Sequence, residues 1–235
     1  MPSPPPTADR PAPARLPAAR RTAIVGTAVA LNTALYLAIN ARAVDAPHLM
    51  QRSGLDAALG WHAWTIWPYW LLLLLAPWLA LGIRGREAFT ATFRAYAIAL
   101  GLNATLWLAW PTRLPRAPLP TGLDPLTDAA WRVLHALDGP ANCFPSGHVT
   151  LPLVVAAGWS LEHRRGAPAL WLLLVALVPT IVTTGQHVLL DAAGGAATAV
   201  LGLALARHPA LGALSRWRPR RPRGRPPTSI GRAGP

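Results

Sequence analysis

Long apolar segments separated by short clusters of charge dominate the chain. The segments that hold no charged residue are 22–41, 57–83, 95–112, 139–161, 166–190 and 192–206. A bilayer core needs about 20 apolar residues per helix. The pattern therefore predicts an all-α, polytopic integral membrane protein with six transmembrane helices in a bundle. We expect these helices at about 23–41, 64–83, 94–110, 148–161, 168–184 and 188–206.

The two ends of the chain differ from this apolar middle. Residues 1–21 and 207–235 are rich in proline and arginine, which predicts a disordered arm and a disordered tail around a membrane domain over 22–206. A cleaved signal peptide is the alternative for the first apolar segment. Its length and the lack of a small-residue cleavage site favour a retained anchor. The tail holds six arginines in residues 216–225, and such a cluster beside a helix end favours contact with anionic lipid over binding of nucleic acid.

Charge gives the expected bundle an orientation. Charged residues make up 13% of the chain, whereas soluble domains carry about 25%. The net charge is +13, and all 22 basic residues are arginine. With a cytoplasmic N-terminus, the inside segments hold 17 arginines and 3 acidic residues, and the outside segments hold 5 arginines and 6 acidic residues. Because cytoplasmic loops carry the excess of positive residues, we expect both termini in the cytoplasm.

Tryptophan, cysteine and arginine usage add smaller constraints. Five tryptophans at helix ends suggest an interfacial aromatic belt: Trp61, Trp64, Trp67, Trp107 and Trp110. A single cysteine, Cys143, excludes an internal disulfide and a multi-cysteine metal site. The absence of lysine, with abundant alanine and proline, is typical of a GC-rich bacterial genome. The expected location is therefore the bacterial cell membrane.

The first polar cluster at a predicted helix end covers residues 142–148, which read Asn-Cys-Phe-Pro-Ser-Gly-His. A Pro-Ser-Gly breaker followed by an apolar run predicts a helix N-terminus. Free backbone N–H groups and the positive end of the helix dipole favour an anion such as phosphate at that place. Ser146 adds a hydroxyl group, and Gly147 allows close backbone approach. An ordinary helix cap, with no chemical role for His148, is the alternative.

The second polar cluster covers residues 183–191 and contains His187 and Asp191. Residues four apart share one face of a helix. A carboxylate beside an imidazole fixes its tautomer and stabilises its cationic form, as in a nucleophile and its orienting group. A structural His–Asp hydrogen bond is the alternative. The small residues that follow allow close helix packing around this face: Gly194, Gly195, Thr198 and Gly202.

Both clusters fall on the same outer side of the membrane in the topology that the arginines predict. The topology rests on charge alone, so this agreement is independent of the histidines. We therefore expect one shared site that faces away from the cytoplasm. His135, in the long outer loop, is a weaker candidate.

The two clusters resemble motifs of the type 2 phosphatidic acid phosphatase superfamily. Residues 145–148, Pro-Ser-Gly-His, are similar to the second motif of that family. Residues 185–194, with His-x-x-x-Asp spacing, are similar to the third. The six-helix plan also fits the family.

The first motif of the family, which pairs a lysine with an Arg-Pro, is matched weakly by residues 111–118. Arg116 is the better candidate for its arginine and Arg113 the next, while the lysine has no counterpart. Thr180 and Ile181 stand where the third motif commonly has Ser-Arg. These departures are similar to the inositol phosphorylceramide synthase-like branch.

The resemblance implies a role for each motif residue. His187 would attack phosphorus and form a phosphohistidine, Asp191 would orient it, and His148 would act as acid and then base. The phosphoryl oxygens would be bound by Arg116, Arg113, Ser146 and Gly147. No metal and no cofactor are implied. The implied activity is hydrolysis of a lipid phosphate, either a phosphomonoester or a pyrophosphate, at the extracytoplasmic face.

Three other functions stay open. One is a phosphotransferase that moves a phospho-head group to an inositol-type or lipid-type alcohol. Another is a metal-dependent membrane enzyme with His148, His187 and Asp191 as ligands, although a helix start suits phosphate better than a metal. The third is a non-catalytic scaffold or transporter with degenerate motifs, which Ile181 and the missing lysine favour and the intact His/His/Asp set disfavours.

Overall fold

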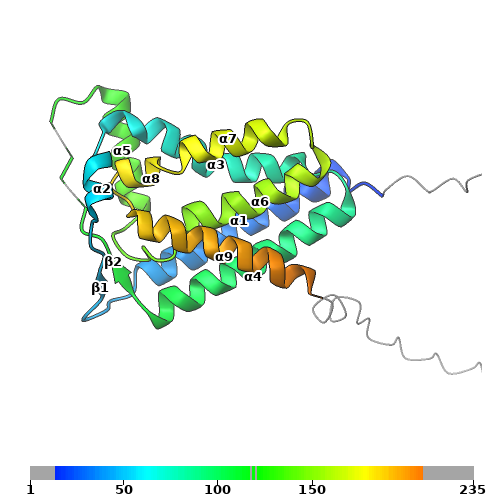
Figure 1. Ribbon diagram of the computed structural model, residues 1–235, viewed down its shortest axis with the longest axis horizontal. Helices are drawn as coiled ribbons and strands as arrows, with labels where there is room; N and C mark the ends of the chain where they lie inside the picture. Colours follow the sequence, from blue (N-terminus) through cyan, green and yellow to red (C-terminus); the bar gives the residue numbers. More distant parts are fainter. Residues whose placement is uncertain (1–13, 117, 120, 209–235) are drawn as a thin grey trace, which may run out of the picture.

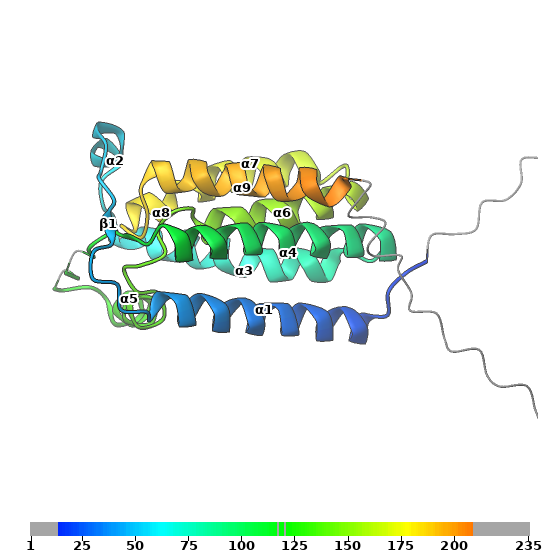
Figure 2. The ribbon, with the colours of Figure 1, turned by 90° about the horizontal axis from the view of Figure 1, so that it is seen from below.

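A computed structural model describes residues 14–116, 118–119 and 121–208, so most of the expected arm and nearly all of the tail lie outside the described residues. The chain is almost entirely helical. Its elements are α1 (Ala18–Asn40), β1 (His48–Leu49), α2 (Gly54–Leu59), η1 (Ala63–Thr65), α3 (Ile66–Gly82), α4 (Arg86–Ala109), β2 (Thr112–Arg113), α5 (Pro125–Leu137), α6 (Gly147–Glu162), α7 (Ala167–Leu177), α8 (Thr180–Thr183) and α9 (Leu189–Arg207). The long helices run side by side, and the short elements gather at one end (Figure 1, Figure 2).

Each of the six expected helical segments is helical, with differences at three places. The helices α1 and α4 begin earlier than expected, at Ala18 and Arg86. Residues 168–184 form two helices, α7 and α8, instead of one. The break falls at Pro179, because proline has no N–H group with which to continue the helical hydrogen bonds.

Apolar side chains cover much of the outer surface of the bundle. Within the described part of the chain, three helical stretches are long and apolar enough to cross a membrane: Ala18–Asn40, Ala63–Gly82 and Leu189–Arg207. Within α1, the buried residues are Val25 and Ile39 alone. Large side chains elsewhere are similarly exposed, among them Leu74, Trp78 and Leu172. Apolar surface of this extent marks contact with lipid or with another protein rather than with water, so the chain has the character of a membrane protein.

The central helix is α6, which packs against α3, α4 and α9. Small residues allow α9 to approach it, as expected. A Cβ atom on Gly195 would lie 2.5 Å from the carbonyl oxygen of Ser146. One turn further along α9, Thr198 and Thr150 meet with their Oγ1 atoms 2.9 Å apart. This close packing brings the two polar clusters of the sequence together.

A layer of short elements covers the end of the bundle at which α6 and α9 begin (Figure 1). Within it, α5 occupies part of the segment that the sequence suggested to be a loop. Asp124 caps α5 by accepting hydrogen bonds from the N–H groups of its first turn, and Pro125 is the first helical residue. Trp131 is buried and donates from Nε1 to the carbonyl oxygen of Ala63, at 3.0 Å. These contacts fix α5 over the start of α3.

The expected tryptophan belt needs one correction. Trp64, Trp67 and Trp110 are exposed at this end of the bundle, as a belt requires. Trp107 is buried and donates from Nε1 to the carbonyl oxygen of Pro145, at 3.0 Å. It is therefore a packing residue between α4 and the start of α6, not a belt residue.

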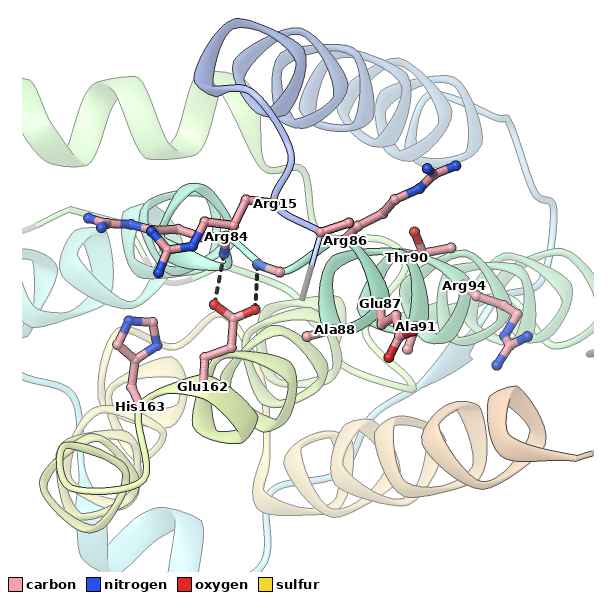
Figure 3. A pocket seen from close by; sticks show the side chains of 12 residues that line it. Arg15, Arg84, Arg86, Glu87, Ala88, Thr90, Ala91, Arg94, Glu162 and His163 are labelled. Carbon is pink, nitrogen blue, oxygen red and sulfur yellow. Dashed lines mark hydrogen bonds between the residues drawn. The ribbon is translucent and has the colours of Figure 1, made fainter. Parts of the chain in front are cut away.

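Arginines gather at the opposite end of the bundle, which holds the chain segments that the charge count assigned to the cytoplasm. Glu162 accepts hydrogen bonds from the N–H groups of Arg84, at 2.9 Å, and Gly85, at 2.7 Å (Figure 3). A broad pocket of about 1060 Å³ lies beside this contact. Its arginines, whose guanidinium groups point in different directions (Figure 3), are Arg15, Arg84, Arg86 and Arg94.

Candidate active site

The two histidines and the aspartate of the polar clusters form a hydrogen-bonded row. Oδ2 of Asp191 lies 3.3 Å from Nδ1 of His187, and Nε2 of His187 lies 3.0 Å from Nδ1 of His148. Asp191 is fully buried, and His187 is 3% exposed. Because a carboxylate accepts hydrogen bonds, Nδ1 of His187 carries the proton and its Nε2 keeps the lone pair. The row thus holds His187 in the tautomer that a nitrogen nucleophile requires.

A glycine turn places His187 at the start of α9. Gly185 has a φ of +71°, a left-handed conformation that side chains with a Cβ rarely adopt. The N–H groups of Gln186 and His187 both donate to the carbonyl oxygen of Ile181, at 3.1 and 3.0 Å. The N–H group of Val188 then donates to Oδ2 of Asp191, at 3.0 Å. Asp191 therefore reaches His187 as a helix cap, not across one face of a continuous helix as the spacing suggested.

Unpartnered hydrogen-bond donors lie at the N-terminus of α6. Ser146 is fully buried, and its Oγ forms no hydrogen bond to any described residue. The N–H groups of Gly147 and His148 likewise have no partner in the described part of the chain. The N–H group of Ser146 donates to the carbonyl oxygen of Asp191, at 3.0 Å, which ties this helix start to the histidine row. Free donors at the positive end of a helix suit an anion.

Gly147 has a different neighbour from the one expected. A Cβ atom at this position would lie 3.3 Å from the indole ring of Trp107. The small size of Gly147 therefore allows α4 to approach α6. The close approach of an anion to its backbone N–H group stays a prediction.

The two candidate arginines differ in their surroundings. Arg116 donates from Nη1 to the carbonyl oxygens of Gly185, at 3.1 Å, and Gln186, at 2.6 Å. Its Nη2 donates to the carbonyl oxygen of Gly139, at 2.8 Å. Arg116 thus organises the loop that carries His187, while its buried Nε has no partner among the described residues. Arg113 is exposed in β2, and the structure does not bring its side chain into this network.

Three residues that the sequence analysis did not assign to the site lie beside His148: Tyr36, Tyr69 and Asp138. Tyr36 donates to Oδ1 of Asp138, and Tyr69 donates to Oδ2, at 3.3 Å. The hydroxyl oxygen of Tyr69 lies 3.4 Å from Nδ1 of His148 and 3.5 Å from Nε2. The available signal was Asp138 itself, an acidic residue that directly precedes the uncharged stretch 139–161.

An apolar cavity of about 320 Å³ opens beside His148, between α1, α3, α4 and α6. Tyr36, Tyr69, Asp138 and His148 line one part of it. The rest of its lining is mostly apolar and includes Leu73, Phe93, Leu134, Leu151 and Val155. The cavity is thus an apolar space that opens beside His148, at one end of the hydrogen-bonded row.

The surroundings of Cys143 and of His135, in the layer of short elements, shift the pKa of each side chain. Burial raises the pKa of the Cys143 thiol to about 12, so this cysteine is not a thiolate nucleophile at neutral pH. Burial and the nearby charge of Arg116 lower the pKa of His135, in α5. Both residues lie outside the long helices of the bundle.

A family model described as the PAP2 superfamily matches residues 28–205. The chain belongs to the PAP2 superfamily. No curated protein and no solved structure matches it. PAP2 superfamily members are in general phosphatases or phosphotransferases, which indicates an enzyme of this general type. The matched range includes both histidine clusters and every candidate arginine.

Ile181 stands where the resemblance led us to expect an arginine. Its side chain is fully buried, and its carbonyl oxygen supports the turn that carries His187. Arg116 donates to the same turn, and Nη2 of Arg52 would lie 3.4 Å from a Cβ atom on Gly185, so two guanidinium groups lie near this loop. Among the described residues, no group of three or more His, Cys, Asp or Glu side chains is arranged to hold a metal ion. The metal-ligand interpretation of His148, His187 and Asp191 therefore gains no support from the geometry.

Proposed function

We propose that this chain is an integral membrane phosphatase that hydrolyses a lipid phosphate through a phosphohistidine intermediate. The observation that carries the proposal is the row of Asp191, His187 and His148 beside the unpartnered donors at the start of α6. This row contains an oriented nucleophile and a second imidazole for proton transfer. Membership of the PAP2 superfamily supports the reaction type.

In the first step, Nε2 of His187 attacks phosphorus while the bond from phosphorus to the leaving oxygen breaks. Protonated His148 gives its proton to that oxygen, which leaves as a lipid alcohol or, from a pyrophosphate, as a lipid monophosphate. Asp191 stabilises the positive charge that develops on His187. Three residues are proposed to bind the phosphoryl oxygens: Ser146, Gly147 and Arg116. Arg113 is left out of this set, because its side chain is exposed and lies outside the network.

In the second step, a water molecule attacks the phosphohistidine. Neutral His148 takes one proton from the water as the bond between phosphorus and Nε2 of His187 breaks. Inorganic phosphate leaves, His187 regains its lone pair, and His148 is again protonated. All protons are accounted for by side chains and water, so the proposed reaction needs no metal and no cofactor.

The apolar cavity supports a lipid as the substrate. It ends at His148 and is lined mainly by aliphatic and aromatic side chains, which favour a hydrocarbon chain over a polar metabolite. A substrate whose chain occupied this cavity would present its phosphate near the histidine row. The nature of the chain and of the head group depends on the lining of the cavity and on the outer loops.

We further propose that six helices span the cell membrane: α1, α3, α4, α6, the pair α7–α8, and α9. The arginines at the end opposite to the histidine row support a cytoplasmic location for that end. A reporter enzyme that is active only outside the cytoplasm should be silent when fused at the C-terminus, and active when inserted between residues 118 and 123. The reverse result would overturn this orientation.

The direct test of the reaction is phosphate release from a panel of lipid phosphates in detergent. We expect His187→Ala to abolish release, because no other group of the row is oriented by a carboxylate. His208→Ala, an exposed histidine at the opposite end, is the matched control and should keep full activity. Unchanged release by His187→Ala would refute the mechanism. Release that EDTA abolishes and added metal restores would refute its metal independence.

A phosphotransferase of the inositol phosphorylceramide synthase-like branch is the second candidate. The observation that favours it is Ile181, at the position where the third PAP2 motif commonly has an arginine. His148 would then take its proton from an acceptor alcohol instead of water. Supplying a phosphodiester lipid together with a lipid alcohol separates the two functions, because a transferase moves the phospho-head group to the acceptor as a new phosphodiester and releases no inorganic phosphate.

A further inference from the structure

Asp138 joins three parts of the chain around His148. It directly follows α5, Tyr36 comes from α1, and Tyr69 comes from α3. Both tyrosine hydroxyls donate to its carboxylate, and Nη2 of Arg116 lies 3.7 Å from Oδ2. Asp138 is 5% exposed. A buried carboxylate with this many partners is strongly held in one position.

The direction of these hydrogen bonds leaves the oxygen of Tyr69 able to accept. Its only proton points to Asp138, and the oxygen keeps lone pairs. The ring nitrogens of His148 lie at 3.4 and 3.5 Å from that oxygen. An N–H group of His148 can therefore donate to Tyr69, which in turn donates to Asp138.

The position of His148 in this structure also obstructs the proposed nucleophile. Nδ1 of His148 lies 3.0 Å from Nε2 of His187, and an attacked phosphorus atom has to come within about 3–3.5 Å of the same nitrogen. The His148 ring therefore has to withdraw from His187 when a phosphoryl group binds. Tyr69 and Tyr36, with ring centroids 5.6 and 6.1 Å from that of His148, are in place to receive it.

We propose that Asp138 is a positioning residue that acts through Tyr69 to hold His148 away from His187, in its protonated, acid form. In this arrangement one N–H group of cationic His148 donates to Tyr69, and the other faces the leaving oxygen. Burial opposes the cation most strongly, and His187 and Arg116 oppose it as well, while the negative charge of Asp138 stabilises it. Asp191 lies beyond His187 and acts on the nucleophile. The inference rests on the proposed function, because it assigns His148 the role of acid.

The test is the pH dependence of kcat/KM for phosphate release by the full chain in detergent. The acid form of His148 is needed in the first step, so activity falls at alkaline pH when this group loses its proton. Asp138→Asn removes the stabilising charge and should move the alkaline limb to lower pH by about one unit. Tyr69→Phe keeps the ring, removes the connecting hydroxyl and should move the same limb in the same direction. The acidic limb, which reports the loss of a proton from His187, should stay in place.

Asp128→Asn is the matched control, since Asp128 pairs with the exposed Arg132 on α5 and has no contact with His148. Its profile should equal that of the wild type. An unmoved alkaline limb in Tyr69→Phe would overturn the proposal, whether or not Asp138→Asn folds. A uniform loss of activity at all pH values, with no shift, would also overturn it and leave a structural role. If His187→Ala retained activity, the proposed function itself would fail, which is a separate result.

Discussion

The two ends of the bundle use charge in different ways. At the end with the histidine row, the acidic residues Asp56, Asp138 and Asp191 are all buried. Each accepts hydrogen bonds from identified side chains or backbone groups. At the opposite end, Arg84, Arg86 and Arg164 are exposed. There Glu162, also exposed, binds two backbone N–H groups (Figure 3).

This difference separates local chemistry from overall orientation. Buried charges interact strongly with their few neighbours because little water screens them. Exposed arginines act through their number and sign, since each exposed pair contributes little by itself. A single substitution should therefore have a large effect at the histidine end and a small effect at the arginine end.

The largest effect is expected from Asp191→Asn. The carboxylate that fixes the tautomer of His187 is replaced by an amide of the same shape, which can donate a hydrogen bond to Nδ1. The ring proton then lies on Nε2, which has no free lone pair for attack. Phosphate release should fall by a factor on the order of 10²–10⁴. Glu162→Gln makes the equivalent replacement at the arginine end and should leave the rate within about twofold of the wild type. Comparable losses in the two variants would remove the distinction between the ends.

The next effect concerns packing at the histidine end. Gly195→Ala would place a Cβ atom 2.5 Å from the backbone carbonyl oxygen of Ser146, and backbone cannot move aside as a flexible side chain does. The free energy of unfolding should fall by about 1–3 kcal/mol, measured by thermal unfolding in detergent. Activity should fall as well, because the same contact positions the start of α6.

Gly26→Ala is the matched control for this packing prediction. No atom lies within 4 Å of a Cβ placed on Gly26, in the middle of α1. Alanine is a better helix former than glycine by about 1 kcal/mol, so this variant should be as stable as the wild type or slightly more stable. A destabilised Gly26→Ala would show that α1 is packed more tightly than its exposed surface indicates.

Much of the fold could be predicted from the sequence, because apolar segments of this length, bounded by charged residues, leave few alternatives to membrane-type helices. The six helical segments and the proximity of the two histidine clusters follow from that pattern. The break at Pro179 and the helix α5 did not. A proline inside an apolar run is compatible with either a kinked helix or the end of a helix. The charges and prolines around α5 suggested a loop, but the segment forms an amphipathic helix.

The candidate site could be predicted where it is local in sequence. His187 and Asp191 are four residues apart, and Ser146 and Gly147 precede His148 directly, so short motifs contain them. Tyr36, Tyr69 and Asp138 come from three distant segments. Their meeting depends on how α1 and α3 pack around α6, which no local pattern encodes. For the same reason, the sequence could rank Arg116 above Arg113 only by a weak motif match, since the position of each side chain depends on contacts between distant segments.

The smallest effect comes from a pair of carboxylates that bind backbone N–H groups, Asp56 at the histidine end and Glu162 at the arginine end. Oδ1 of Asp56 accepts from the N–H of Leu189, at 2.7 Å, and Oδ2 accepts from the N–H of Ser53, at 2.7 Å. An amide has one accepting oxygen, so Asp56→Asn must lose one of these bonds, and should lower the free energy of unfolding by about 1 kcal/mol. Glu162→Gln loses a similar bond in an exposed place and should change stability by less than about 0.5 kcal/mol.

The pH dependence of stability tests whether the charge of Asp56 is responsible for its effect. Burial by itself raises the pKa of Asp56, but hydrogen bonds from Ser53 and Leu189 and the nearby Arg52 outweigh it and hold the pKa below its ordinary value of 3.8. A lowered pKa in the folded state means that the carboxylate stabilises the fold above pH 3.8, and that this contribution is lost as the pH falls through the folded-state pKa. Thermal unfolding of wild type and Asp56→Asn should therefore differ at neutral pH and converge in acid. A difference that persists unchanged in acid would mean that the charge of Asp56 is not what holds the first turn of α9.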